Sequence, residues 1–311
     1  MRPTTSTEGS GDRHRRPANS PQPKPDGHDA ARAERATLVT DSSGTSGEEQ
    51  EYMIDTSVAN TARVWNYWLY GKDNYPADRD VGDYVRALMP DIVDDARAVR
   101  AFLVRVVRYL VGEAGIRQFL DIGTGLPTAN NTHEVAQASD PQCRIVYVDN
   151  DPLIMAHARA LLTSTPEGHT DYLHADLRDP DTILREATRT LDFTQPTALM
   201  LLGIVCHILD DDEAHAIVQR LLDALPVGSY LVLCDPTAEL RGEVMEEAMR
   251  FWNEKATPPI RTRSRQELTR FFDHLELLEP GVVSATLWRP DLSSIGTPAE
   301  VNNFGGVGCK L

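Results

Sequence analysis

The stretch Phe119-Leu-Asp-Ile-Gly-Thr-Gly-Leu126 decides the fold. Its first residues are typical of a short buried strand, and Gly123 and Gly125 follow at alternate positions. Glycine has no Cβ and readily adopts positive φ, so a ligand can approach the backbone closely at such a turn. A helix is expected next, from about Thr128 to Ala138. The succession of strand, glycine turn and helix N-terminus predicts a site for a nucleotide-like ligand.

Around this stretch, apolar strand segments alternate with helical segments. Strands are expected at 119–122, 144–149, 171–174, 198–204 and 230–234, and the intervening helices at 128–138, 152–162, 181–188 and 211–224. This alternation predicts a parallel sheet with helices on both faces. Two further helices are expected near 243–255 and 264–272. The short link Glu279-Pro-Gly281 then predicts an antiparallel hairpin of strands 275–278 and 283–288, and residues 302–311 are expected to be extended.

Composition divides the 311 residues into three predicted parts. Residues 1–50 are rich in Pro, Ser, Gly and charged residues and are expected to form a disordered tail. Residues 51–115 are expected to form a helical cover, whose first helix begins with Ser57 as its N-cap. Residues 116–311 contain the alternating pattern and are expected to form the ligand-binding domain.

Charge and composition exclude several classes of partner. The net charge of −16 argues against a nucleic-acid partner, because such proteins present a basic face. No apolar run is long enough to cross a membrane, and no signal peptide is visible, so a cytoplasmic location is expected. The four cysteines have no CxxC spacing and are expected to be free thiols. No His, Asp or Glu cluster has metal-ligand spacing, so no metal site is predicted.

The glycine turn distinguishes between possible nucleotides. A dinucleotide-binding turn has a third glycine, G-x-G-x-x-G, and this chain has Thr128 at that position. Asp121, immediately before the turn, would repel a pyrophosphate. The same carboxylate suits a ligand that carries an ammonium and a sulfonium group, as S-adenosylmethionine does.

Acidic residues also end the next two predicted strands. A carboxylate at Asp149, beside Asn150, can accept hydrogen bonds from both hydroxyls of a ribose. Asp176 follows the third strand and can accept from an adenine amino group, with Leu177 as an apolar wall. Because the carboxyl ends of parallel strands line the ligand crevice of an open sheet, these acids and Asp121 are expected to share one site.

Asp121-Ile-Gly-Thr-Gly125, Asp149 and Ala175-Asp176 resemble the cofactor motifs of class I S-adenosylmethionine-dependent methyltransferases. The resemblance implies a Rossmann-like α/β fold. Its seven-stranded, mostly parallel sheet would have the order 3-2-1-4-5-7-6, with the last hairpin supplying the antiparallel strand 7. It also implies S-adenosyl-L-methionine as cofactor, bound in part by the turn residues Gly123, Thr124 and Gly125. Many members have a further glycine where this chain has Pro127, so we expect an altered loop there.

A narrower resemblance covers residues 53–311. The segments that carry it include Ser57–Arg63, Gly71-Lys-Asp-Asn74, Phe119–Thr128 and Val146–Pro152, and they look like an actinobacterial S-adenosyl methyltransferase family. The family implies the fold and the cofactor but not the methyl acceptor. It also gives Lys72 and Asn74 a role as a lid over the cofactor, whereas the residue types alone are typical of an ordinary turn.

His207 is the candidate catalytic base. It follows the fourth predicted strand, and its surroundings are similar to a histidine motif of small-molecule O-methyltransferases. Histidine titrates near neutrality, which suits a general base. The alternative is a histidine that caps a helix or forms a wall of the cofactor site. No Asn-Pro-Pro-Tyr motif follows the fourth strand, which disfavours methylation of adenine or amide nitrogen.

Other aromatic and basic residues have two interpretations. Trp65 is expected in the core, while Trp68 and Tyr70 fit either the core or the wall of an acceptor pocket. The alternating arginines Arg261, Arg263 and Arg265 could bind an acidic acceptor, but a solvated basic turn is the favoured interpretation.

The sequence therefore predicts a methyltransferase that transfers a methyl group from S-adenosylmethionine to a small molecule, at oxygen. One alternative is a non-catalytic module that binds S-adenosylmethionine as a sensor or scaffold. A second is an NAD-dependent oxidoreductase. The acceptor and the oligomeric state are not given by the sequence.

Overall fold

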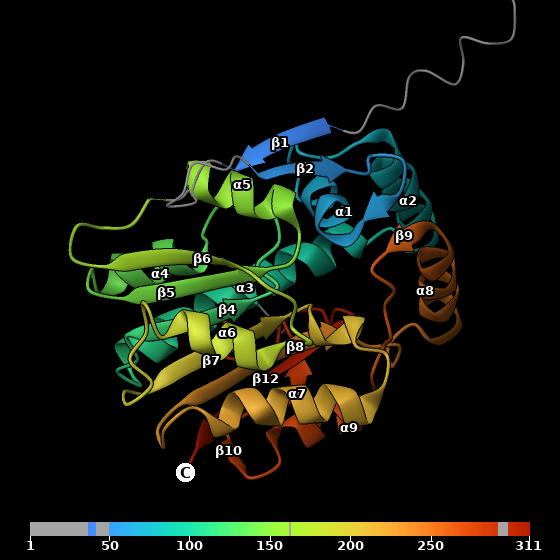
Figure 1. The fold of residues 1–311 in the computed structure, drawn as a ribbon. Helices are drawn as coiled ribbons and strands as arrows, with labels where there is room; N and C mark the ends of the chain where they lie inside the picture. The colour runs from blue at the N-terminus through green and yellow to red at the C-terminus, as the bar shows by residue number, and fades with distance from the viewer. Residues whose placement is uncertain (1–36, 42–49, 162, 292–297) are drawn as a thin grey trace, which may run out of the picture. The chain divides into compact units, whose positions relative to one another are not determined.

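A β-sheet carries the glycine turn at the C-terminal end of its central strand. The computed structural model describes residues 37–41, 50–161, 163–291 and 298–311. Its main sheet follows the path β10-β12-β8-β7-β4-β5-β6, which read from β6 is the order 3-2-1-4-5-7-6 when these strands are numbered along the chain (Figure 1). The strands are β4 (Gln118–Ile122), β5 (Arg144–Asp149), β6 (His169–His174), β7 (Thr197–Leu202), β8 (Tyr230–Pro236), β10 (Leu275–Leu277) and β12 (Asn303–Lys310).

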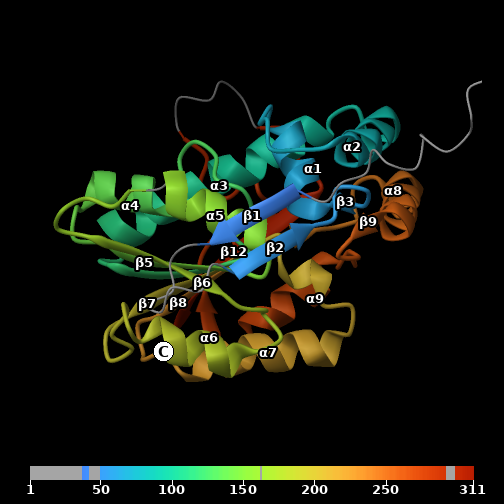
Figure 2. The same cartoon turned by 45° about the horizontal axis from the view of Figure 1, so that its top comes forward.

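Helices cover both faces of this sheet, as the sequence pattern predicts. The helices are α1 (Thr61–Trp68), α2 (Pro76–Leu88), α3 (Ile92–Gly112), α4 (Thr132–Ser139), α5 (Pro152–Leu161), α6 (Pro180–Ala187), α7 (Asp211–Asp223), α8 (Gly242–Lys255) and α9 (Arg265–Thr269). Helices α3 and α4 pack on one face with Phe119 and Val232, and α6 and α7 pack on the other with Leu120 and Leu199 (Figure 2). Every residue of β4 and all but the last residue of β7 are buried, as expected for strands that are covered from both sides in a parallel sheet.

The prediction of a terminal hairpin is wrong about which strands pair with each other. The antiparallel strand between β8 and β10 is the glycine-rich C-terminal segment β12, which the sequence indicated only as extended. Segment 283–288 contributes just the two-residue strand β11 (Val283–Ser284), which also pairs with β12. Glycine is depleted in strands, which conceals β12 in the sequence. In the fold, a Cβ on Gly305 would lie 2.8 Å from the Leu233 carbonyl oxygen, so the bare backbone allows close packing.

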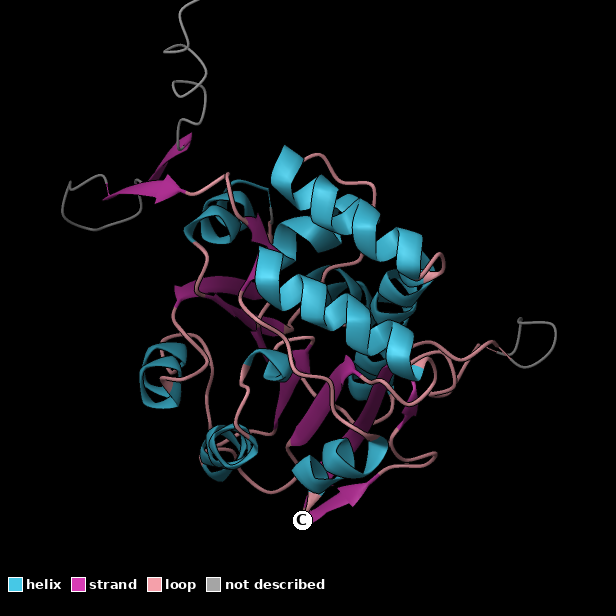
Figure 3. Cartoon of the chain, turned by 90° about the vertical axis from the view of Figure 1, so that its right-hand side faces the viewer, coloured by secondary structure: helices cyan, strands magenta, loops and turns pink. Residues whose placement is uncertain are grey.

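The N-terminal part differs from expectation at two points. Residues 1–36 and 42–49 of the predicted tail lie outside the described residues, but Thr37–Asp41 (β1) pairs antiparallel with Gln50–Ile54 (β2), so this part is not a featureless tail (Figure 3). The first helix begins at Thr61 with Asn60 as its N-cap, and not at Ser57. The boundaries proposed at residues 50 and 115 remain predictions. Among the described residues, none of the helices is long and apolar enough to cross a membrane.

The loop after the glycine turn is longer than expected. Helix α4 begins at Thr132, four residues later than predicted, and Pro127 lies in the loop before it. Asn130 has a left-handed φ of 61°, which a helix does not accommodate. Asn131 caps the helix in a capping box with Glu134 and also exchanges hydrogen bonds with the backbone of Thr128. The chain is thereby held in an open loop beside the turn.

Candidate active site

A cavity opens at the C-terminal ends of β4, β5 and β7, beneath residues of α1 and α3. The volume of this cavity is about 150 Å³. Seven of the residues singled out from the sequence line it: Asp121, Gly123, Thr124, Gly125, Asp149, Asn150 and His207. Their convergence follows from the parallel sheet, because successive strand ends meet at the same edge.

The glycines of the turn shape the cavity floor. Gly123 and Gly125 have φ values of 78° and 63°, in the region that favours glycine. A Cβ on Gly123 would lie 2.5 Å from the Cβ of Ile204, so the turn can approach the loop after β7 only without a side chain. Gly125 instead faces open space, because a Cβ added there would meet nothing within 4 Å, so its backbone is accessible to a ligand.

Asp121 is a buried carboxylate at the end of β4. Its Oδ2 atom accepts a hydrogen bond from Thr132 Oγ1 at 2.6 Å. Burial raises the pKa of Asp121 to about 6, although the Thr132 hydrogen bond and the Arg100 charge act in the opposite direction. A cationic ligand group that reached this carboxylate would favour its ionised form.

Asp149 is the last residue of the neighbouring strand β5. Its Oδ2 accepts from the Gly125 backbone N–H at 3.1 Å, and its Oδ1 accepts from the Asp151 N–H at 3.0 Å. The first contact ties the glycine turn to β5. Burial raises the pKa of Asp149 to about 6, against these two backbone hydrogen bonds.

A second, smaller cavity continues the first along the ends of β5 and β6. It is lined by Asp176 and Leu177 and shares Asn150 and His207 with the main cavity. The Asn150 side-chain amide donates to Asp176 Oδ2 at 3.0 Å. The predicted adenine-side residues therefore lie next to the predicted ribose-side residues, in the order in which an adenosyl group would need them.

His207 ends a short 3₁₀ turn, η1 (Val205–His207), directly after β7. The ring is buried, and its Nδ1 lies 2.9 Å from the carbonyl oxygen of Pro259. A carbonyl only accepts, so Nδ1 carries the proton in the neutral ring and Nε2 holds a free lone pair. Burial lowers the pKa of His207, and the nearby Arg178 charge acts in the same direction, which keeps the ring neutral near pH 7.

Arg263 is a component of this site that the sequence pattern did not indicate. It is 1% exposed, so the expectation of a solvated arginine is wrong. Its guanidinium donates to the carbonyl oxygens of Val205 and Ile208 and to Asp211 Oδ1 at 3.0 Å. These contacts enclose the turn that carries His207. A single arginine in a polar segment has no sequence signal for such burial.

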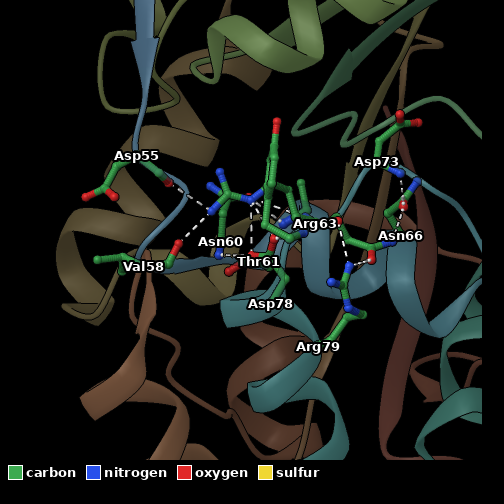
Figure 4. A network of polar contacts seen from close by, with 12 residues as sticks. Asp55, Val58, Asn60, Thr61, Arg63, Asn66, Asp73, Asp78 and Arg79 are labelled. Atoms are coloured by element: carbon green, nitrogen blue, oxygen red, sulfur yellow. Dashed lines mark hydrogen bonds and ion pairs between the residues drawn. The ribbon is translucent and has the colours of Figure 1, made fainter. Parts of the chain in front are cut away.

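A buried ion pair holds the wall of the cavity that lies opposite the sheet. Arg63 Nε donates to both oxygens of Asp78, at 3.1 and 2.9 Å, and both side chains are almost fully buried (Figure 4). Asp78 also accepts from the backbone N–H groups of Asn60 and Tyr75. Because Asn60 lines the cavity, this network fixes the position of the wall relative to α2.

The two tryptophans of α1 differ in their surroundings. Trp65 lines the cavity. Trp68 is buried away from it, donates from Nε1 to the Gly82 carbonyl oxygen and packs against Trp252 at 5.9 Å between ring centroids. Tyr70 is 67% exposed. Trp65 is also partly buried against the core, so the expectation of a core position holds in part, and a helix face of four-residue spacing does not reveal that the same residue borders a cavity.

Lys72 and Asn74 do not line the cavity. Asn74 donates to the Asn66 side-chain oxygen at 2.9 Å and to the Gly71 carbonyl oxygen at 3.0 Å, and it accepts from Arg79. These contacts are those of a structured turn that packs against Asn66 of α1, and Asn66 itself lines the cavity. The proposed lid role of Lys72 and Asn74 stays a prediction.

Comparisons with known proteins agree with this geometry. The structure is similar to that of a DUF574 family protein from Streptomyces avermitilis, with 44% identity, a TM-score of 0.79 and coverage of 83% of this chain and 99% of the other. It is also similar to a protein from Thermobifida fusca described as a candidate methyltransferase, with 40% identity, a TM-score of 0.75 and coverage of 82% and 96%.

No curated protein matches the chain. The model of the S-adenosyl methyltransferase family, in contrast, matches residues 47–311, which include every described residue of the cavity. This chain belongs to the S-adenosyl methyltransferase family.

Proposed function

We propose that this S-adenosylmethionine-dependent methyltransferase methylates an oxygen atom of a small molecule, with His207 as general base. The observation that carries the proposal is the hydrogen bond from His207 Nδ1 to the Pro259 carbonyl oxygen. It fixes the ring at the cavity and leaves Nε2 as the atom that can accept a proton.

The residues of the two connected cavities fit the cofactor. Asp121 and Asp149 are buried carboxylates at one end of the strands, suited to an ammonium and to ribose hydroxyls. Gly125 leaves space above its backbone, and Asp176 and Leu177 line the extension for the adenine ring. We propose that these residues, with Gly123, Thr124 and Asn150, hold S-adenosylmethionine.

The rest of the main cavity supports a small, largely apolar acceptor. Trp65, Leu69 and Leu103 line it from the helices, and Leu202 lines it from the end of β7. Its polar residues in the segment 60–69 are Asn60, Thr61 and Asn66, which are all uncharged. An uncharged acceptor with a hydroxyl group matches this lining better than an acid or a nucleic acid, since an apolar wall penalises a buried charge.

The chemistry that we assign to the chain is orientation and proton removal. When bound, the cofactor supplies an electrophilic methyl group and a neutral thioether leaving group. His207 Nε2 would accept the proton of the acceptor hydroxyl, which would make the acceptor oxygen a nucleophile towards that methyl group. Arg263 holds the turn that carries His207, so the base is positioned before the acceptor arrives.

The test compares His207→Gln and His207→Ala with the wild type. We expect both variants to bind S-adenosylhomocysteine within about twofold of wild type by calorimetry. Turnover with an acceptor from a panel of phenols, alcohols and amines should fall by about 10²-fold or more, the usual contribution of a general base. The wild-type rate should rise with pH through a pKa below that of an ordinary histidine. Unchanged turnover in both variants would contradict a role as general base and would favour the interpretation that His207 forms a wall of the cofactor site.

The alternatives from the sequence are weakened by different observations. Membership of the S-adenosyl methyltransferase family removes the basis for an NAD-dependent oxidoreductase and for a module without catalysis. The absence of a nucleic-acid partner remains part of this proposal and is supported by the net charge of −16. The cytoplasmic location also remains a prediction.

A further inference from the structure

At one end of the active-site cavity, two buried polar atoms have no hydrogen-bond partner among the residues that the structure describes. They are Arg100 Nε and Thr128 Oγ1, and both residues line the cavity. A buried donor or hydroxyl without a partner costs free energy, so it persists where a ligand or water completes it. The two atoms come from different elements, α3 and the loop before α4, which makes this end of the cavity a convergence of polar groups.

Arg100 is held in place from one side only. Its Nη2 donates to the carbonyl oxygens of Ala129 and Asn130, at 3.2 and 2.8 Å. Among the described residues, Nη2 is the only guanidinium nitrogen of Arg100 with a hydrogen-bond partner. The unusually long loop before α4, with its left-handed Asn130, supplies these two carbonyls. The loop therefore orients a cation while leaving its other donors free.

A carboxylate lies at the same end of the cavity. Asp121 and Arg100 both line the main cavity and also a small side cavity, which extends to Gly125 and Thr132. Thr132 occupies one oxygen of Asp121, and the charge of Arg100 acts on the Asp121 carboxylate. A fixed cation and a fixed anion next to one another match a ligand group that carries both charges on neighbouring atoms. An α-amino acid is such a group, with an ammonium and a carboxylate on one carbon.

We propose that Arg100, assisted by Thr128, binds the carboxylate of the methionine portion of S-adenosylmethionine, opposite the ammonium group at Asp121. The guanidinium nitrogens that lack partners donate to the carboxylate, and such charge-assisted hydrogen bonds are among the strong ones in proteins. The loop around Pro127, which departs from the usual glycine turn, serves to position this arginine. This inference concerns the cofactor and does not depend on the acceptor or on His207.

The test uses two ligands that differ by the carboxylate alone. Calorimetry measures the affinity of wild type and Arg100→Met for S-adenosylhomocysteine and for its decarboxylated analogue. We expect Arg100→Met to weaken S-adenosylhomocysteine binding at least tenfold and to change binding of the decarboxylated analogue by less than about twofold. Thr128→Val should give a smaller loss with the same ligand dependence. Equal weakening of both ligands, or no weakening of either, would overturn the proposal.

Two controls separate this role from folding and from the acceptor. Arg97→Met removes an exposed arginine one turn earlier on α3 and should leave both affinities unchanged. Thermal melts of Arg100→Met show whether the variant is folded, and if it is not, Thr128→Val and the wild-type comparison of the two ligands carry the test. A wild-type protein that binds both ligands equally, with an Arg100 effect confined to the KM of a carboxylated acceptor, would place the carboxylate of the acceptor at Arg100 and contradict the assignment.

Discussion

Single residues decide the chemistry of the cavity through burial. Asp121 and Asp149 lie at the ends of neighbouring strands, and burial raises the pKa of each to about 6. In the free protein, both carboxyl groups therefore gain or lose their proton at a pH close to neutral. The ammonium group of the cofactor favours the ionised form of Asp121, and the ribose hydroxyls donate to the ionised form of Asp149, so cofactor affinity is coupled to pH through these two groups.

We expect the affinity for S-adenosylhomocysteine to fall as the pH decreases below about 6. The sign follows from the direction of the shifts: the carboxylates are ionised above about pH 6 and take up protons below it. At pH 5.5 each carboxylate would be about one-quarter ionised, which predicts a loss of about fourfold for each group relative to pH 7.5. Calorimetry at the two pH values measures this loss.

One variant tests how much of the pH dependence each carboxylate causes. Asp149→Asn keeps the shape and one acceptor atom but does not titrate, so the remaining dependence should be close to that of Asp121 alone. The same affinity at pH 5.5 and 7.5 in the wild type would show that the two carboxylates do not contact the cofactor.

Among the secondary-structure elements, α1 and α2 depend on a buried charge pair. Arg63 contributes one charge and Asp78 the other, and the Asp78 carboxylate additionally accepts two backbone N–H groups, from Asn60 and Tyr75. Desolvating both charges is costly, so the pair is not by itself a source of stability. Its consequence is geometric, because one carboxylate connects the start of α1, the loop before α2 and the cavity wall.

Breaking that pair should be far more costly than breaking an exposed one. Arg63→Met leaves the Asp78 carboxylate buried without its cation, and we expect a loss of about 3–5 kcal/mol in the free energy of unfolding. The matched control is Arg97→Met, whose partner Asp94 is 70% exposed, with an expected loss of at most about 1 kcal/mol. Urea denaturation followed by circular dichroism compares the two variants. Similar losses would contradict the structural role given to Arg63.

For the molecule as a whole, the last strand completes the sheet. β12 lies between β8 and β10, so the C-terminal residues 303–310 pair with strands that precede them by about 70 and about 30 positions. The glycines of β12 let large side chains approach its backbone. A Cβ on Gly305 would lie 2.9 Å from the Cys234 Cβ and 3.1 Å from the Phe102 ring, and one on Gly308 would lie 2.8 Å from the Phe272 ring.

Adding one methyl group to this strand should destabilise the protein. We expect Gly305→Ala to cost about 1–3 kcal/mol, the usual range for overpacking a core, since backbone and ring atoms must move. Gly112→Ala is the control, because nothing lies within 4 Å of its Cβ position at the end of α3 and alanine favours a helix. Thermal unfolding should show a lower melting temperature for Gly305→Ala and an equal or higher one for Gly112→Ala. No difference between the variants would indicate that the strand is packed loosely.

The alternating fold, the glycine turn and the acids at the strand ends can be predicted from the amino-acid sequence alone. These follow from local rules: apolar runs form buried strands, glycines permit the turn, and strand ends converge in a parallel sheet. Seven residues predicted for the site line the same cavity, and the roles assigned to them remain predictions: Asp121, Gly123, Thr124, Gly125, Asp149, Asn150 and His207.

Only the tertiary structure decided the partners that come from distant segments. Arg100, Arg263 and Trp65 lie in ordinary helical or polar stretches, and their roles depend on what the folded chain brings beside them. The identity of strand β12 was decided in the same way, because a glycine-rich segment has no strand signal until neighbours such as Phe102 and Phe272 pack against its backbone. Local sequence fixes backbone preference, whereas burial, pairing and unpaired donors arise from contacts between residues far apart in the chain.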